Sequence, residues 1–146
     1  MKFKRGYKYQ VVEDCYFDLP VHFNTLAQDE FDWVTLVDNR IFFRAGYAWD
    51  GPSGPTYDTP DTLVPSLVHD GLYQLMREGV LPREERADAD YVFYQLLIER
   101  IPEVEGFADH IRAFNLRRRY HAWYRAVRGF AGFAAAGTGK PVEEVR

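Results

Sequence analysis

The sequence has a single cysteine, Cys15, among its 146 residues. One thiol excludes an internal disulfide framework and a zinc site built from several cysteines. No uninterrupted apolar stretch approaches the ~20 residues that a helix needs to cross a bilayer. The basic N-terminus is followed by polar and acidic residues, so it does not predict a signal peptide. A chain that folds without disulfides is typical of a reducing compartment, and we expect cytoplasmic synthesis.

Aromatic residues are abundant: the chain has 11 Phe, 10 Tyr and 3 Trp, and aromatics make up 16% of it. Hydrophobic residues account for 47% and charged residues for 27%, the balance of an ordinary globular protein. The length is that of one domain with a substantial core. We therefore expect residues 1–146 to form a single domain.

Charge is distributed unevenly around the formal net charge of −4. Residues 61–110 contain 4 basic and 11 acidic residues, whereas residues 111–146 contain 8 basic and 2 acidic ones. Such asymmetry can indicate a surface for nucleic acid or membrane. The other interpretation, which we prefer, is that the basic C-terminal helix packs near the acidic middle of the chain, where the opposite charges weaken its field.

The first 45 residues predict β-structure. Short runs rich in β-branched and aromatic side chains are separated by turn-forming residues, and they cover residues 8–12, 15–19, 31–37 and 40–44. Asp38 and Asn39 stand between two of these runs, as in a hairpin turn, although the favoured glycine is missing. A small antiparallel sheet is expected.

A loop and then helices follow the strands. Residues 46–65 contain three glycines and four prolines and predict a packed loop. Helical periodicity then covers residues 62–128, with predicted helices at 62–77, 82–100 and 106–128. Residues 129–146 predict a loose tail. Strands followed by helices indicate an α+β domain.

The first predicted helix carries one polar stripe. At 100° per residue, five side chains able to do chemistry fall in a narrow band opposite the apolar face: Ser66, His69, Asp70, Tyr73 and Arg77. An imidazole exchanges protons near neutral pH, so His69 is the candidate general base. Asp70 is placed to help flank a bound water or metal ion. The stripe is expected to face solvent or another element.

The second predicted helix offers a complement, because Arg86 and Asp90 are four residues apart and share a face. If the two helices pack as an antiparallel hairpin, Asp90 reaches His69 or Tyr73. A carboxylate behind an imidazole holds its tautomer and raises its basicity. We take His69, Asp70 and Asp90 as candidate catalytic residues, and Tyr73 and Arg86 as supports. The alternative is a satisfied polar network that only fixes helix packing.

The segment from Trp49 to Pro55 precedes this helix and contains Asp50, Ser53 and two glycines. Glycine lets main-chain atoms approach a ligand closely, so Trp49 and Ser53 are candidate supporting residues. Carboxylates are hard oxygen donors suited to Ca²⁺ or Mg²⁺, and Asp50 and Asp70 are the candidate ligands of such a divalent cation. The alternative is a rigid turn capped by Asp50 and Ser53.

Three motifs occur in a recognisable order: Trp49 to Pro55, His69 to Tyr73, and Arg86 to Asp90. Together they resemble the pattern D-G-x-S-x-P, H-D-x-L-Y, R-x-x-A-D of a family common in tailed phages and prophages. The resemblance covers residues 46–129. It implies a phage or prophage origin, hence the cytoplasm of a bacterial host or incorporation in the virion, but no activity, because the function of that family is itself unsettled.

Secreted phospholipases offer a chemical analogy. They carry a His-Asp pair on a helix, a tyrosine four residues after the histidine, and a later helical aspartate. The analogy implies His69 as base, Asp70 as calcium ligand, and Tyr73 and Asp90 as supports. The disulfides of those enzymes are absent here, so the likeness is one of chemistry and not of fold.

Two functions from different classes remain open. The first is a metal-dependent hydrolase connected with lysis or the cell envelope. The second is a non-enzymatic virion, tail or assembly protein whose His-Asp-Tyr cluster is structural and whose arginine-rich helix 112–128 docks on other phage structural proteins. Arginines alternate with aromatic residues along that helix, as in single-strand binders. The rings recur at helical spacing, however, so we assign most of them to the core and the arginines to a solvated or docking face, and we do not expect nucleic-acid binding.

Overall fold

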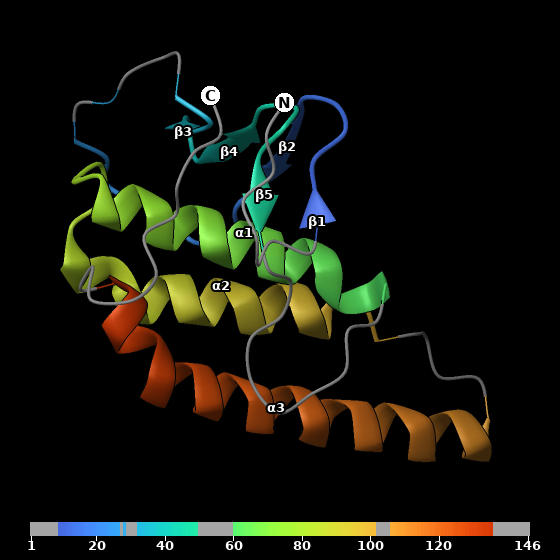
Figure 1. The fold of residues 1–146 in the computed structure, drawn as a ribbon. Helices are drawn as coiled ribbons and strands as arrows, with labels where there is room; N and C mark the ends of the chain where they lie inside the picture. The colour runs from blue at the N-terminus through green and yellow to red at the C-terminus, as the bar shows by residue number, and fades with distance from the viewer. Residues whose placement is uncertain (1–8, 27, 29–31, 50–59, 102–105, 136–146) are drawn as a thin grey trace.

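The computed structural model describes residues 9–26, 28, 32–49, 60–101 and 106–135 (Figure 1). The strands form one layer of the molecule, and three helices are stacked beneath them. Helix α2 lies between α1 and α3. The α+β class expected from the sequence is confirmed.

The strands form two small antiparallel sheets where one was expected. β1 (Tyr9–Gln10) pairs with β5 (Ala48–Trp49). The second sheet has the order β2-β4-β3, from β2 (Cys15–Asp18), β4 (Arg40–Phe43) and β3 (Val34–Val37). β5 lies inside the predicted loop 46–65, because its two residues find a partner far away in sequence at β1.

The hairpin predicted at Asp38 and Asn39 is confirmed. Both residues have positive φ, 51° and 61°, as the tight turn between β3 and β4 requires. The Asn39 side chain donates to the Leu19 carbonyl at 3.0 Å and accepts from the Phe23 backbone N–H at 3.1 Å. These two long-range bonds fasten the turn to the chain after β2, so asparagine serves where glycine was expected.

The helices are α1 (Pro60–Arg77), a 3₁₀ turn η1 (Arg83–Glu85), α2 (Arg86–Ile98) and α3 (Phe107–Ala135). α1 ends where Gly79 adopts φ 78° and the backbone N–H of Val80 bonds to the Leu75 carbonyl at 2.8 Å. α1 begins two residues earlier than predicted. α3 continues through Gly129 to Ala135, because a glycine costs a helix interior only about 1 kcal/mol and does not by itself end the helix. The tail predicted from residue 129 therefore starts too early, and residues 136–146 lie outside the described residues.

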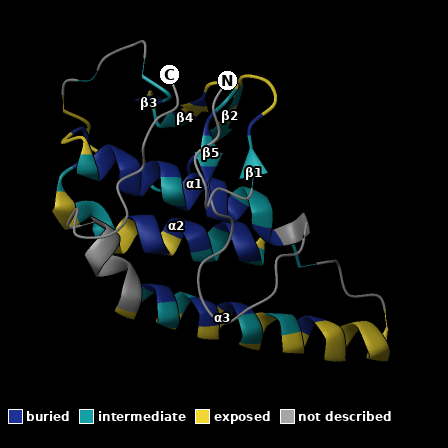
Figure 2. Cartoon of the chain, in the orientation of Figure 1, coloured by how far each residue is buried: buried dark blue, intermediate teal, exposed yellow. Residues whose placement is uncertain are grey.

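The main hydrophobic core lies between the sheets and α1. A Cβ atom added at Gly71 would lie 2.6 Å from the Phe43 ring, so only glycine allows α1 to approach β4 this closely. A second cluster joins α2 to α3 through five buried residues: Phe93, Leu97, Tyr120, Trp123 and Val127. Figure 2 shows that α1 and α2 are largely buried, whereas the exposed residues of α3 gather toward its N-terminal end. Among the described helices, none is long and apolar enough to cross a membrane.

Candidate functional site

Within the polar stripe of α1, His69 and Tyr73 face α2, whereas Ser66 meets Trp49 of β5 and the side chains of Asp70 and Arg77 are half-buried. Ser66, His69 and Tyr73 are only 2%, 4% and 3% exposed. The apolar side of α1 packs toward the sheets, so the opposite side is left to meet the next helix. Of the two orientations considered for the stripe, the one toward another element is confirmed. Polar groups buried in this way need hydrogen-bond partners, and α2 supplies one in Asp90.

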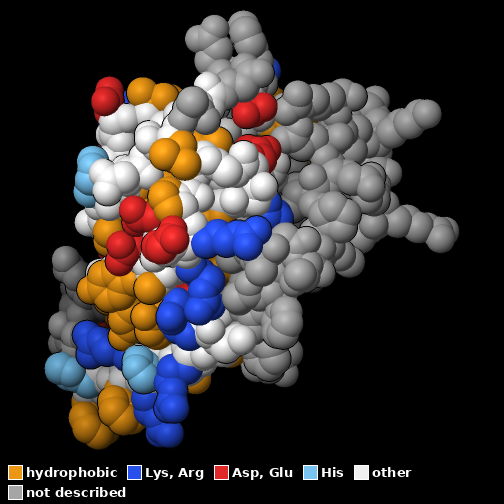
Figure 3. Space-filling model, turned by 90° about the vertical axis from the view of Figure 1, so that its left-hand side faces the viewer, with side chains coloured by type: hydrophobic (Ala, Val, Ile, Leu, Met, Phe, Trp, Pro, Cys, Tyr) orange, Lys and Arg blue, Asp and Glu red, His pale blue; other side chains and the backbone are white. Residues whose placement is uncertain are grey.

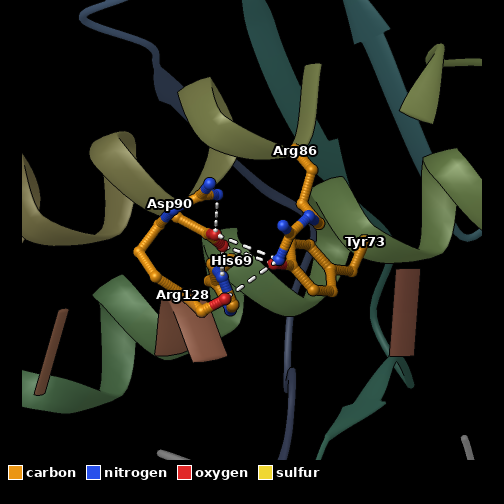
Figure 4. Close-up of polar contacts among 5 residues, drawn as sticks. All are labelled: His69, Tyr73, Arg86, Asp90 and Arg128. Carbon is orange, nitrogen blue, oxygen red and sulfur yellow. Dashed lines mark hydrogen bonds and ion pairs between the residues drawn. The ribbon is translucent and has the colours of Figure 1, made fainter. Parts of the chain in front are cut away.

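Asp90 is fully buried, with 0% of its surface exposed, and its Oδ1 atom contacts both polar rings of α1. The distance from His69 Nε2 to Asp90 Oδ1 is 2.8 Å. The Tyr73 hydroxyl donates a hydrogen bond to the same oxygen (Figure 4). The expectation that Asp90 reaches His69 or Tyr73 is thus confirmed for both residues.

Two arginines neutralise the second oxygen of Asp90. Arg128 of α3 donates from Nη1 to Asp90 Oδ2 at 2.7 Å, and Arg86 of α2 places Nη1 4.0 Å from the same atom (Figure 4). Arg86 also donates to the Arg128 carbonyl at 3.2 Å. One carboxylate therefore joins side chains from α1, α2 and α3. We call His69, Tyr73, Arg86, Asp90 and Arg128 the Asp90 network.

The Asp90 network keeps its central carboxylate ionised. Burial alone would raise the pKa of Asp90, but hydrogen bonds from His69, Tyr73 and Arg128 and the charge interaction with His69 outweigh burial and leave the pKa below its ordinary value. Burial raises the pKa of Tyr73 far above its ordinary value, and the hydrogen bond to Asp90 adds to the effect. The hydrogen bond to Asp90 raises the pKa of Arg128. Near neutral pH, Asp90 is thus an anion and Tyr73 a neutral donor.

This protonation pattern selects the tautomer of His69. An ionised carboxylate can only accept hydrogen bonds, so the proton of a neutral His69 ring must sit on Nε2, toward Asp90. The lone pair is then on Nδ1, away from Asp90. Aromatic neighbours hold the ring in place: its centroid lies 4.3 Å from that of Tyr73 and 5.1 Å from that of Phe93. The arrangement provides one oriented basic nitrogen.

The other predicted residues lie apart from the Asp90 network or outside the described part of the chain. Trp49 is buried, and its Nε1 donates to Ser66 Oγ at 3.0 Å. Ser66 lies one helical turn before His69 on α1. Asp70, next to His69 on α1, is half-buried. Asp50 and Ser53 lie outside the described residues. No group of three potential metal ligands occurs within the described ranges.

Arg128 is the network residue that the sequence did not reveal. In the sequence it appears only as one of six arginines along the predicted helix 106–128, all expected on a solvated or docking face. The only available signal was indirect, because a buried Asp90 needs more than His69 and Tyr73 to balance its charge. The spacing of residues could not show which arginine meets it.

Comparison of the chain with protein-family models, with curated proteins and with solved structures finds no match. The class of site is therefore defined by its own geometry, a buried imidazole–carboxylate pair supported by a tyrosine and two arginines. The resemblance to the phage family stays a prediction.

Proposed function

We propose that this chain is a hydrolase in which His69 is the general base. The observation that carries the proposal is the contact of His69 Nε2 and the Tyr73 hydroxyl with a single oxygen of Asp90. This contact orients the imidazole with its lone pair on Nδ1, the atom that would accept the proton of a water molecule. It is also the pairing that the phospholipase analogy implies.

In the proposed reaction, His69 Nδ1 takes a proton from a water molecule while the water oxygen attacks the electrophilic centre of an ester. The imidazolium that forms is stabilised by the negative charge of Asp90. His69 then returns the proton to the leaving oxygen, so the base is regenerated. Tyr73 and Arg128 are positioning residues, because they act on His69 through their hydrogen bonds to Asp90.

A divalent cation, Ca²⁺ or Mg²⁺, held by Asp50 and Asp70 remains part of the proposal as a prediction. Asp70 is next to His69 on α1 and is only half-buried, which supports a role for its carboxylate at the edge of the site. Asp50 lies outside the described residues. Bound there, the cation would polarise the substrate oxygen. Calorimetric titration with each cation, using Asp70→Asn as the control, tests this part.

The test of the hydrolase uses two substitutions of the same histidine. In His69→Gln, the amide nitrogen can replace Nε2 as the donor to Asp90, but no base replaces Nδ1. In His69→Asn, the shorter amide cannot replace the donor to Asp90. Hydrolysis of a panel of carboxylic and phosphoric esters by the purified chain is measured together with thermal unfolding. His110→Gln on the exposed part of α3 is the matched control.

We expect His69→Gln to retain a melting temperature close to that of the parent and to lose about 10²-fold or more of kcat/KM, the contribution of a general base. His69→Asn should lose both activity and stability. Equal activity of the parent and His69→Gln on the best ester would overturn the proposal, as would the absence of hydrolysis across the panel.

A second function is favoured by a different observation. Arg128 binds Asp90 from α3 at 2.7 Å, so the Asp90 network joins all three helices in a way that a catalytic pair alone does not require. Buried polar networks of this kind often specify packing. The second candidate is therefore a non-enzymatic virion, tail or assembly protein, in which the arginine-rich helix 112–128 docks on other phage structural proteins. In that case His69→Gln changes neither hydrolysis nor stability.

The biological setting that we propose follows the resemblance to the phage family. The protein would be made in the cytoplasm of a bacterial host, and either act in lysis or on the cell envelope or enter the virion. What supports this setting is the order of the three sequence motifs. The position of the gene among tail genes or lysis genes distinguishes the two uses.

A further inference from the structure

α3 carries an apolar stripe on the side that faces away from the protein core. Phe107, Ile111 and Phe114 are 82%, 48% and 57% exposed. Their spacing of four and then three residues places them on one helical face over two turns. The opposite face of α3 holds the buried Ala113 and, farther along the helix, the α3 residues of the α2–α3 cluster, such as Tyr120. Packing of the opposite face on α2 fixes the rotation of α3 about its axis. The stripe therefore faces away from α2.

Arginines continue and flank this stripe. Arg118 follows Phe114 by four residues and lies over its ring, with the guanidinium carbon 5.8 Å from the ring centroid. Arg125 lies on the same face seven residues after Arg118 and is exposed, and the exposed Arg117 lies beside that face. Asp109 is the only acidic residue from Phe107 to Gly129. Figure 3, in whose lower part α3 lies, shows Lys/Arg side chains beside hydrophobic ones there.

We propose that this face of α3 docks on an anionic lipid surface. Two turns of exposed apolar side chains suit insertion at the boundary between headgroups and acyl chains, while arginines beside them suit anionic headgroups. The charge of the whole chain is −4, so the positive charge of α3 stands against an acidic remainder. An anionic surface would therefore attract this one face and repel the rest, which orients the protein. The inference does not rest on the proposed hydrolase.

Other occupants fit this surface less well. Binders of single-stranded nucleic acid use a positively charged groove, whereas the outer side of a single helix is convex. A second copy of the chain, paired across the same face, would bring two sets of arginines together at unfavourable energy. A flat lipid surface demands neither concavity nor opposite charge on a protein partner.

The test is sedimentation of the full chain with vesicles of two compositions. One contains phosphatidylglycerol and phosphatidylcholine in equal amounts, and the other phosphatidylcholine alone. We expect the anionic vesicles to be bound at least about tenfold more tightly. Ionic strength of about 1 M should weaken this binding, because the screening length falls to about 3 Å. Binding of single-stranded DNA to the chain tests the nucleic-acid alternative. Analytical ultracentrifugation of the chain alone tests whether a second copy occupies the face.

Substitutions separate the stripe from exposed apolar residues in general. Phe107→Gln, Ile111→Gln and Phe114→Gln combined should reduce binding to anionic vesicles about tenfold or more, because the inserted apolar surface is lost. Arg117→Gln with Arg118→Gln should reduce it to a similar extent. The matched control replaces three exposed apolar residues elsewhere: Val12→Gln, Leu26→Gln and Val37→Gln. Circular dichroism verifies that each variant is folded.

The proposal predicts that the control variant binds as the parent does. It is overturned if the parent does not sediment with anionic vesicles, or if the stripe variant and the control lose binding equally. Two other results would assign the face to another occupant and also overturn the proposal. One is tighter binding to single-stranded DNA than to vesicles. The other is a parent that is dimeric and a stripe variant that is monomeric.

Discussion

Two aspartate–arginine pairs in this molecule have the same length and very different surroundings. On the outer side of the three-stranded sheet, Arg40 Nε lies 2.7 Å from Asp18 Oδ1, and the two side chains are 41% and 69% exposed. Between the helices, Arg128 Nη1 lies 2.7 Å from Asp90 Oδ2, and the exposures are 34% and 0%. Judged by distance alone, the two pairs would be expected to contribute equally to stability. They differ in the burial of the aspartate, which is exposed in the first pair and fully buried in the second.

The exposed pair is surrounded by water and ions, which reduce its net contribution to stability. The buried carboxylate has lost its water, so every neighbour that donates to it is needed. We therefore expect changes of charge at Asp18 or Arg40 to affect stability little and changes at Asp90 to affect it strongly. Four experiments sharpen this difference.

Removing the buried charge should have the largest effect. In Asp90→Asn, the amide group presents donors to Arg128 and Arg86, which are donors themselves. We expect a loss of about 3 kcal/mol or more in unfolding free energy, the size typical of breaking a buried pair. At 2–4 °C per kcal/mol, the melting temperature should fall by roughly 10 °C. A decrease no larger than that of Asp18→Asn would show that the buried pair is not special.

The contact between sheet and helices should give the next effect. In Gly71→Ala, the new methyl group meets the Phe43 ring at 2.6 Å, so the ring or the helix must move. We expect a loss of about 1–3 kcal/mol, as for other overpacked cores. Gly129→Ala is the control, because nothing lies within 4 Å of its Cβ position, and helix propensity should stabilise that variant by about 0.5–1 kcal/mol. Urea unfolding of both variants measures the predicted opposite signs.

Acid should weaken the helix side through Asp90. The pKa of Asp90 is below its ordinary value of 3.8 in the folded protein, despite burial, because its hydrogen-bond partners favour the anion. Its stabilising contribution is therefore complete above about pH 5 and is lost as the pH falls through 3.8 toward the folded-state pKa. Urea unfolding at a series of pH values should show a shallower acid decline for Asp90→Asn than for the parent. Parallel declines would contradict this origin.

The exposed pair should give the smallest effect. Asp18→Asn removes the partner of Arg40 but leaves both side chains in water, so thermal unfolding should shift only slightly. The small difference should shrink further when salt is added. A shift that approaches that of Asp90→Asn would remove the distinction between the two regions.

Much of the fold could be predicted from local patterns in the sequence. Alternating and β-branched runs predicted β2, β3 and β4, and the helical period predicted α1, α2 and α3. The pairing of β1 with β5 could not be predicted, because two-residue strands carry no periodic signal. The end of α3 could not be located from the sequence, because a glycine such as Gly129 stands at many helix ends but costs a helix interior only about 1 kcal/mol. Local residue preference thus failed where distant contacts or a long helix decided.

The site shows the same division. His69, Tyr73, Arg86 and Asp90 could be found because helical spacing places each pair on one face, and two adjacent helices bring the faces together. Arg128 could not be found, since its role depends on how α3 lies along α2. No spacing within α3 distinguishes it from the other arginines of that helix.

The bond from Arg128 to Asp90 also sets the longitudinal position of α3. Sliding α3 by one turn, about 5.4 Å, would bring Tyr124 opposite the carboxylate in place of a guanidinium. The bond thus fixes the position of α3 along its axis relative to α2. The length of the segment that joins α2 to α3 then does not need to set that position. Changes in its length should therefore leave the two helices in the same alignment.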